Sequence, residues 1–73
     1  MNYKDVFSPS NWLIEHGGLR YVQLKRQMEH AIADGILPPG MPLPPEREIA
    51  KITGLSRVTV RKAIAPLVEN GLV

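Results

Sequence analysis

The sequence predicts an all-α fold, or an α fold with one minimal β element, and three observations support this prediction. Residues 21–32 and 57–70 place apolar side chains at the three- and four-residue spacing of an amphipathic helix. Residues 36–45 contain five prolines, which exclude a helix and a central strand from that stretch. A chain of 73 residues holds one small domain with a thin core, so three helices and a short N-terminal helical segment account for its length.

The composition excludes several classes of protein. The absence of cysteine removes disulfides, thiolate catalysis and cysteine-based zinc sites. The net charge of +2 is only mildly basic, and a hydrophobic content of 44% is usual for a globular chain. The first ten residues lack the apolar stretch of a signal peptide, and no apolar run approaches the roughly 20 residues of a membrane span. We therefore expect a cytoplasmic protein with no membrane partner.

Residues 1–20 differ from the rest and contain the only Trp and the only Phe. A Ser-Pro pair at 8–9 predicts the start of a short helix, and a Gly-Gly pair at 17–18 predicts its end. Because an isolated helix of this length is marginal in water, it needs a surface to pack on. We interpret this segment as an N-terminal appendage. Both a local cap on the core and a docking site fit its apolar residues, which are Trp12, Leu13 and Ile14.

The main domain is expected over residues 21–73 and begins with a helix. Gly35 is the expected end of that helix, because glycine accepts the left-handed conformation after a last turn. The proline-rich stretch that follows predicts a rigid connector with at most one short edge strand near residues 41–43. The apolar stripe of the helix consists of Tyr21, Leu24, Met28, Ala31 and Ile32.

Two further helices are predicted after the connector. Residues 46–53 begin with two glutamates in one turn, which suit the positive end of a helix dipole. Gly54 allows a tight turn, and Ser56 is a good N-cap for the third helix, residues 57–70. Within that helix Pro66 lacks an N–H and predicts a kink or a tilt. The apolar stripe of the third helix consists of Val60, Ala63, Ile64 and Leu67.

The spacing of three residues indicates how the last two helices meet. A helix-turn-helix needs a small residue where the helices cross, a glycine in the turn, and a buried aliphatic residue on the second helix. Ala50, Gly54 and Val60 meet these needs, although a generic helical hairpin meets them too. Charge favours a nucleic-acid reader, since residues 56–68 contain three basic residues and no acidic one. The face opposite the stripe consists of Arg57, Val58, Arg61, Lys62 and Ala65.

Residues 21–73 resemble a known family in five motifs: YVQL, IADGILPPG, LPPEREIA, GLSRVTVRKA and ENGLV. This pattern is similar to the N-terminal winged helix-turn-helix domain of the GntR family of bacterial transcription regulators. The TVRKA form resembles the HutC-like branch of that family. The resemblance implies a sequence-specific DNA-binding transcription regulator whose partner is double-stranded operator DNA. We expect this regulator to be a repressor.

The resemblance also implies roles for individual residues. The third helix would enter the major groove, and Arg47 at the start of the second helix would hold the DNA backbone. Two hydroxyls would contact phosphates, and two arginines would read bases or phosphates, because an arginine fork can grip guanine O6 and N7 together. Val58 stands where the family has a polar residue and would offer only apolar contact. The expected DNA-binding set is Arg47, Ser56, Arg57, Val58, Thr59, Arg61 and Lys62.

Besides Val58, two features depart from the family pattern. Pro45 stands where the family has a serine that caps the second helix. The sequence stops at Val73, where family members continue into a two-stranded wing and then an effector-binding domain. We therefore expect both to be absent here, so a small-molecule effector would act only through that missing domain. A homodimer on two half-sites is expected of the full-length regulator.

Other functions are less well supported by the residues. A second hypothesis is a protein-interaction module whose exposed basic face docks an acidic partner, and sequence-dependent binding would separate it from a DNA reader. An enzyme is not expected, because no nucleophile, acid–base pair or cofactor motif occurs. His16 and His30 lack the spacing of a metal site, so neither a metal nor any other cofactor is expected.

Overall fold

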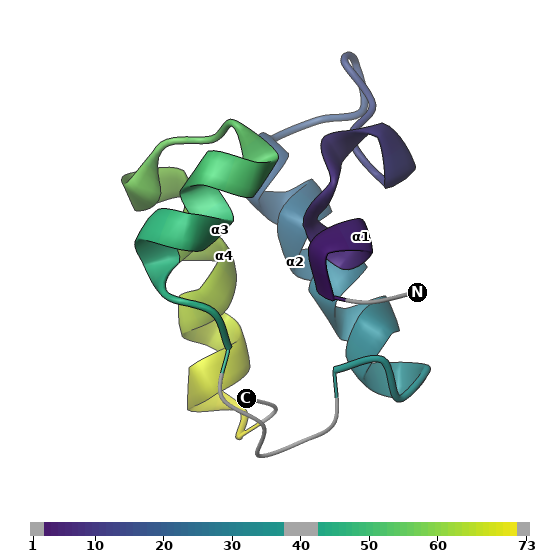
Figure 1. Cartoon of the computed structure of the whole chain (residues 1–73), viewed down its shortest axis with the longest axis vertical. Helices are drawn as coiled ribbons and strands as arrows, with labels where there is room; N and C mark the ends of the chain where they lie inside the picture. The colour runs from purple at the N-terminus through teal and green to yellow at the C-terminus, as the bar shows by residue number, and fades with distance from the viewer. Residues whose placement is uncertain (1–2, 38–42, 72–73) are drawn as a thin grey trace.

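The computed structural model describes residues 3–37 and 43–71, and within them all regular structure is helical (Figure 1). The described residues contain no strand, which agrees with the predicted all-α fold and its helix-turn-helix core. The strand expected near residues 41–43 falls mainly outside the described residues. The elements are α1 Tyr3–Phe7, a 3-10 turn η1 Pro9–Asn11, α2 Arg20–Ala33, α3 Glu46–Thr53 and α4 Arg57–Glu69.

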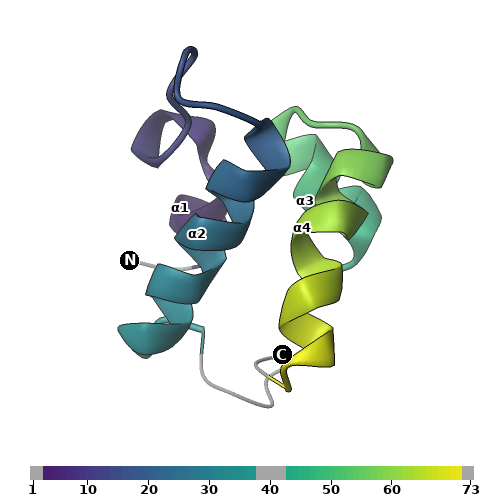
Figure 2. The ribbon, with the colours of Figure 1, turned by 180° about the vertical axis from the view of Figure 1, so that it is seen from behind.

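The helices form two layers. Figure 1 shows α1 and α3 in front of the two long helices, and Figure 2 shows α2 and α4 side by side from behind. Leu24 and Met28 on α2 are fully buried in one cluster with Val60 and Leu67 on α4. The predicted apolar stripes of both long helices therefore face each other across the core. Gly35 follows α2 with a φ of 77°, the left-handed conformation expected of it.

The turn between α3 and α4 has the predicted helix-turn-helix geometry. Gly54 adopts a φ of 75°, and its N–H donates to the carbonyl of Ala50 at 2.9 Å. Thr53 is buried, and its hydroxyl donates to the carbonyl of Ile49 at 2.8 Å while accepting from the N–H of Leu55 at 3.2 Å. These bonds satisfy the polar groups of a turn whose side chains lie in the core. They fix the angle at which α4 leaves the turn.

Pro66 lies inside α4 without ending it. The helix continues to Glu69, and Leu67, one residue further on, is fully buried. Packing of this last turn against the core therefore offsets the hydrogen bond to Lys62 that a proline cannot donate.

Replacing Pro66 with Ala is expected to stabilise the domain. The new N–H restores the hydrogen bond, with a gain of up to about 3 kcal/mol less the roughly 0.4–1 kcal/mol that proline contributes by restricting the unfolded chain. Thermal unfolding followed by circular dichroism measures the change. A melting temperature that is unchanged or lower would show that α4 bends at this position for the sake of its packing.

The N-terminal segment departs from the prediction. The helix expected from Pro9 to the Gly-Gly pair is wrong, because only the short turn η1 forms there and Ile14 is 66% exposed. The hydroxyl of Ser8 does not cap it and donates instead to the carbonyl of Lys4 at 2.9 Å. The α-helix of this segment is α1, which was not predicted. Its Val6 and Phe7 are fully buried, and removing these two apolar side chains from water stabilises α1 against the core.

Side-chain amides of α2 hold this segment in place. Gln23 is buried, and its Oε1 accepts from the N–H of Ile14 at 2.8 Å. Its Nε2 donates to the carbonyls of Ile14 and Gly18, both at 3.1 Å. One turn later, Nε2 of Gln27 donates to the carbonyl of Val6 at 3.2 Å. The N-terminal segment therefore follows a defined path along α2, although it has little regular structure.

Candidate nucleic-acid interface

The first two turns of α4 present a solvent-exposed face. Arg57, Val58, Arg61 and Lys62 are exposed, while Val60 on the opposite side is fully buried. Arg57 and Arg61 are four residues apart, so their side chains lie on the same side of the helix. The helix-turn-helix geometry thus turns one basic face of α4 away from the core.

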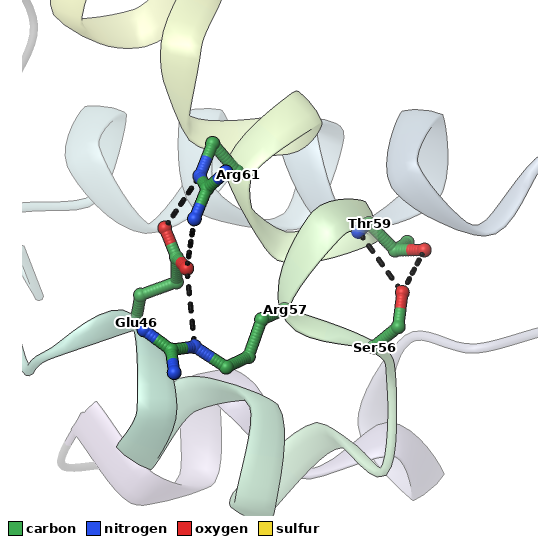
Figure 3. Close-up of polar contacts among 5 residues, drawn as sticks. All are labelled: Glu46, Ser56, Arg57, Thr59 and Arg61. Carbon is green, nitrogen blue, oxygen red and sulfur yellow. Dashed lines mark hydrogen bonds and ion pairs between the residues drawn. The ribbon is translucent and has the colours of Figure 1, made fainter.

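A single carboxylate lies between the two arginines (Figure 3). Oε1 of Glu46, the first residue of α3, accepts from Nε of Arg57 at 3.3 Å and from Nη2 of Arg61 at 2.9 Å. Its Oε2 accepts from Nε of Arg61 at 3.1 Å, so the contact with Arg61 is bidentate. The side chains of Arg57 and Arg61 are still 62% and 65% exposed. Such an exposed contact adds little stability, so its main effect is to orient the two guanidinium groups.

The ion pairs change the titration of the groups involved. The hydrogen bond from Arg61 is the main reason why the pKa of Glu46 lies below its ordinary value, and partial desolvation opposes it. The same hydrogen bond raises the pKa of Arg61. Glu46 is therefore ionised at neutral pH, and the cluster of Glu46, Arg57 and Arg61 carries one net positive charge.

Removing the Glu46 carboxylate is expected to change how stability depends on pH. Because the folded state lowers its pKa, the carboxylate stabilises the domain above its ordinary pKa of 4.5 and loses this effect as the pH falls through the lower folded value. The melting temperatures of the wild type and Glu46→Gln should differ most near pH 7 and converge toward pH 3, in low salt. Glu69→Gln, which removes an exposed carboxylate at the other end of α4, is the control. Parallel curves for wild type and Glu46→Gln would contradict the expectation.

Ser56 and Thr59 form the N-terminal cap of α4 (Figure 3). Oγ of Ser56 accepts from the N–H of Thr59 at 3.1 Å, as the predicted N-cap should. The two hydroxyls also share a hydrogen bond at 2.8 Å. Two hydroxyls have two O–H donors, and this contact uses one of them. One O–H of the pair therefore remains for an external acceptor such as a phosphate oxygen.

Comparison with protein families identifies the domain. The model described as "Bacterial regulatory proteins, gntR family" matches residues 20–73. The chain belongs to the GntR family. The helix-turn-helix formed by α3 and α4 is accordingly the DNA-binding core of a GntR domain, and the family is one of transcription regulators rather than enzymes.

Two relatives illustrate the similarity. The HTH-type transcriptional repressor NagR of Bacillus subtilis is 50% identical over 52 residues, which are 71% of this chain and 21% of NagR. The HTH-type transcriptional regulator GgaR of Escherichia coli K12 is 42% identical over 53 residues, which are 73% of this chain and 21% of GgaR. The chain thus spans about a fifth of the length of these relatives. No solved structure matches it.

Some of the predicted site residues contact one another in the GntR domain, and others do not. Arg57 and Arg61 meet at Glu46, and Ser56 meets Thr59, whereas Lys62 is exposed beside Arg61 without joining the cluster. Arg47 is exposed on α3, one position after Glu46 and so about 100° further around that helix.

Glu46 itself was missed in the sequence. A glutamate in the first turn of a helix is already explained by the helix dipole, so the sequence gives Glu46 no further role. An available signal was that the two arginines, four residues apart on one helix face, have no acid within their own helix turn.

Two further findings concern the described part of the chain. Residues 3–37 and 43–71 contain no group of three or more His, Asp or Glu side chains arranged to hold a metal ion. No helix among them is long and apolar enough to cross a membrane.

Proposed function

We propose that this GntR domain is the DNA-reading part of a transcription repressor, with α4 lying in the major groove of its operator. The observation that carries the proposal is the pair of exposed arginines on α4, oriented by one carboxylate from α3. The relative NagR is a repressor by name, which supports the direction of regulation.

The arginine pair has donors left for base edges. Glu46 engages one N–H of Arg57, through Nε, and two of Arg61, through Nε and Nη2. A guanidinium has five N–H donors, so Arg57 keeps four and Arg61 keeps three for acceptors such as guanine O6 and N7. Because Glu46 restricts their motion, fewer side-chain rotamers are lost on binding. Glu46 is in this account a positioning residue.

Other residues of the face would position the duplex. The remaining O–H of the Ser56–Thr59 pair and the exposed Arg47 and Lys62 suit phosphate oxygens, which set register and carry no sequence information. Val58 is 59% exposed and suits a thymine methyl group.

The whole regulator would act in the cytoplasm as a homodimer on two half-sites, with the effector bound outside the present chain. Two reading helices are separated by about one helical turn of DNA in such dimers. A ligand that changes this separation would change the fit to both half-sites together.

Selection from a pool of random DNA duplexes tests the proposal with the 73-residue chain. Repeated rounds of binding at about 0.1 M salt should enrich a short sequence motif, because base-edge contacts discriminate by about 1–3 kcal/mol per pair. A second arm adds an acidic polypeptide, polyglutamate, as competitor. A chain that enriches no motif and is displaced by polyglutamate would instead be a module for acidic partners.

A further inference from the structure

A second basic surface lies next to the predicted reading face. An open groove of about 670 Å³ between α1 and α3 is lined by three basic side chains, one acidic side chain and one aliphatic side chain. Figure 1 shows these two helices together in the front layer of the molecule. The lining residues are Lys4, Arg47, Glu48, Lys51 and Ile52.

Both walls of this groove are fixed by packing. On one side, Phe7 and Val6 are fully buried and hold α1 against the core, so Lys4 is not on a loose end of the chain. On the other side, Arg47 and Lys51 are four residues apart and lie on one side of α3. All three basic residues are exposed, and together with Glu48 they give the groove a net charge of +2.

The groove and the exposed face of α4 are both bordered by the first turn of α3. Glu46 contacts both arginines of α4, and the next residue along α3 is Arg47, which lines the groove. α3 contacts both α4 and α1, so basic residues of all three helices lie around it. One extended polyanion suits these basic residues better than separate small anions do. Once the polyanion is bound at one residue, its contacts with the others cost no further translational entropy.

We propose that Lys4 and Lys51, together with Arg47, bind the phosphate backbone of the same duplex that α4 reads, outside the bases it contacts. This inference rests on the proposed DNA-binding function. Its new element is the N-terminal segment, which lies outside residues 20–73 matched by the GntR family and contributes Lys4. The segment thus adds affinity that does not depend on sequence.

The expected effect is a change in salt dependence. Each phosphate contact contributes about −0.9 to the slope of log K against log salt, so Lys4→Gln and Lys51→Gln should each make the slope shallower by about 0.9. Phosphate contacts contribute little at 1 M salt, and a slope difference of about 0.9 over the tenfold dilution to 0.1 M corresponds to about eightfold weaker binding for each variant. The double variant should lose both amounts, on a selected duplex and on a random duplex alike.

Fluorescence anisotropy of labelled duplexes with the 73-residue chain, between 50 and 200 mM KCl, measures these slopes. Lys25→Gln on α2 removes the same charge away from the groove and should leave the slope within experimental error. Circular dichroism confirms that each variant is folded, as expected for the exposed side chains of Lys4 and Lys51 and the half-buried side chain of Lys25.

The outcomes separate this inference from the function on which it rests. Shallower slopes for Lys4→Gln and Lys51→Gln, with an unchanged preference for the selected duplex, support the groove. A wild type that prefers the selected duplex while the double variant keeps its full slope would overturn the groove alone. A wild type that binds no duplex would overturn both proposals.

Discussion

Replacing Phe7 with Ala is expected to destabilise the domain by about 3–5 kcal/mol, the usual cost of deleting a buried phenyl ring. Phe7 is fully buried and belongs to the cluster that contains Leu24, Met28 and Ile49, so its loss leaves a cavity between α1, α2 and α3. At about 0.05–0.15 kcal/mol per residue, a chain of this length has a total stability of only some 4–11 kcal/mol. The variant should therefore be largely unfolded at modest urea concentrations.

Urea denaturation followed by circular dichroism measures this loss. Ile14→Ala is the matched control, because it removes a large apolar side chain from the same N-terminal segment at a position that is 66% exposed. That variant should remain within about 0.5 kcal/mol of the wild type. A Phe7→Ala variant that loses less than about 1 kcal/mol would show that the N-terminal segment contributes little to the core.

Replacing Arg61 with Ala is expected to weaken binding to a selected duplex by about 1–3 kcal/mol and to relax the preference at one base position. The bidentate contact with Glu46 fixes Arg61, so the variant loses an oriented fork rather than a mobile charge. Arg57→Ala should behave in the same way at another base position, although its single contact through Nε at 3.3 Å orients it less firmly.

Arg47→Ala is the comparison that separates base reading from backbone binding. It also removes one positive charge, but we expect equal losses on selected and random duplexes and a salt slope shallower by roughly one unit. Competition titrations of both duplexes measure the ratio for each variant. Equal losses on the two duplexes for all three variants would contradict the assignment of Arg57 and Arg61 as base readers.

Local features predicted the second half of the fold well. Residues 46–53 form α3 as predicted, and α4 ends at Glu69, one residue before the expected end. The end of α3 and the start of α4 depend on neighbours in the chain. Gly54 accepts the positive φ that ends α3, and Ser56 caps the N–H of Thr59 at the start of α4. Such signals act within one helical turn, so they are readable without knowledge of the rest of the molecule.

The N-terminal segment could not be predicted in the same way. Pro9 starts only a single 3-10 turn, and the preceding helix has five residues, too few to show a periodic apolar pattern. What selects this arrangement is the burial of Val6 and Phe7 between other helices. The polar Gln23 was likewise outside the predicted apolar stripe, yet it is buried because its amide binds the backbone of Ile14 and Gly18.

The helix-turn-helix, the Ser56 cap and the basic, acid-free face of α4 each depend on residues a few positions apart, so they can be predicted from the sequence alone. Which charges meet, in contrast, depends on how the helices pack. Glu46 is 11 and 15 residues from its partners Arg57 and Arg61, and Lys4 reaches the groove beside Arg47 from the opposite end of the chain. The turn at Gly54 brings the start of α4 back to α3, whereas α1 reaches α3 only when the core packs and buries Val6 and Phe7.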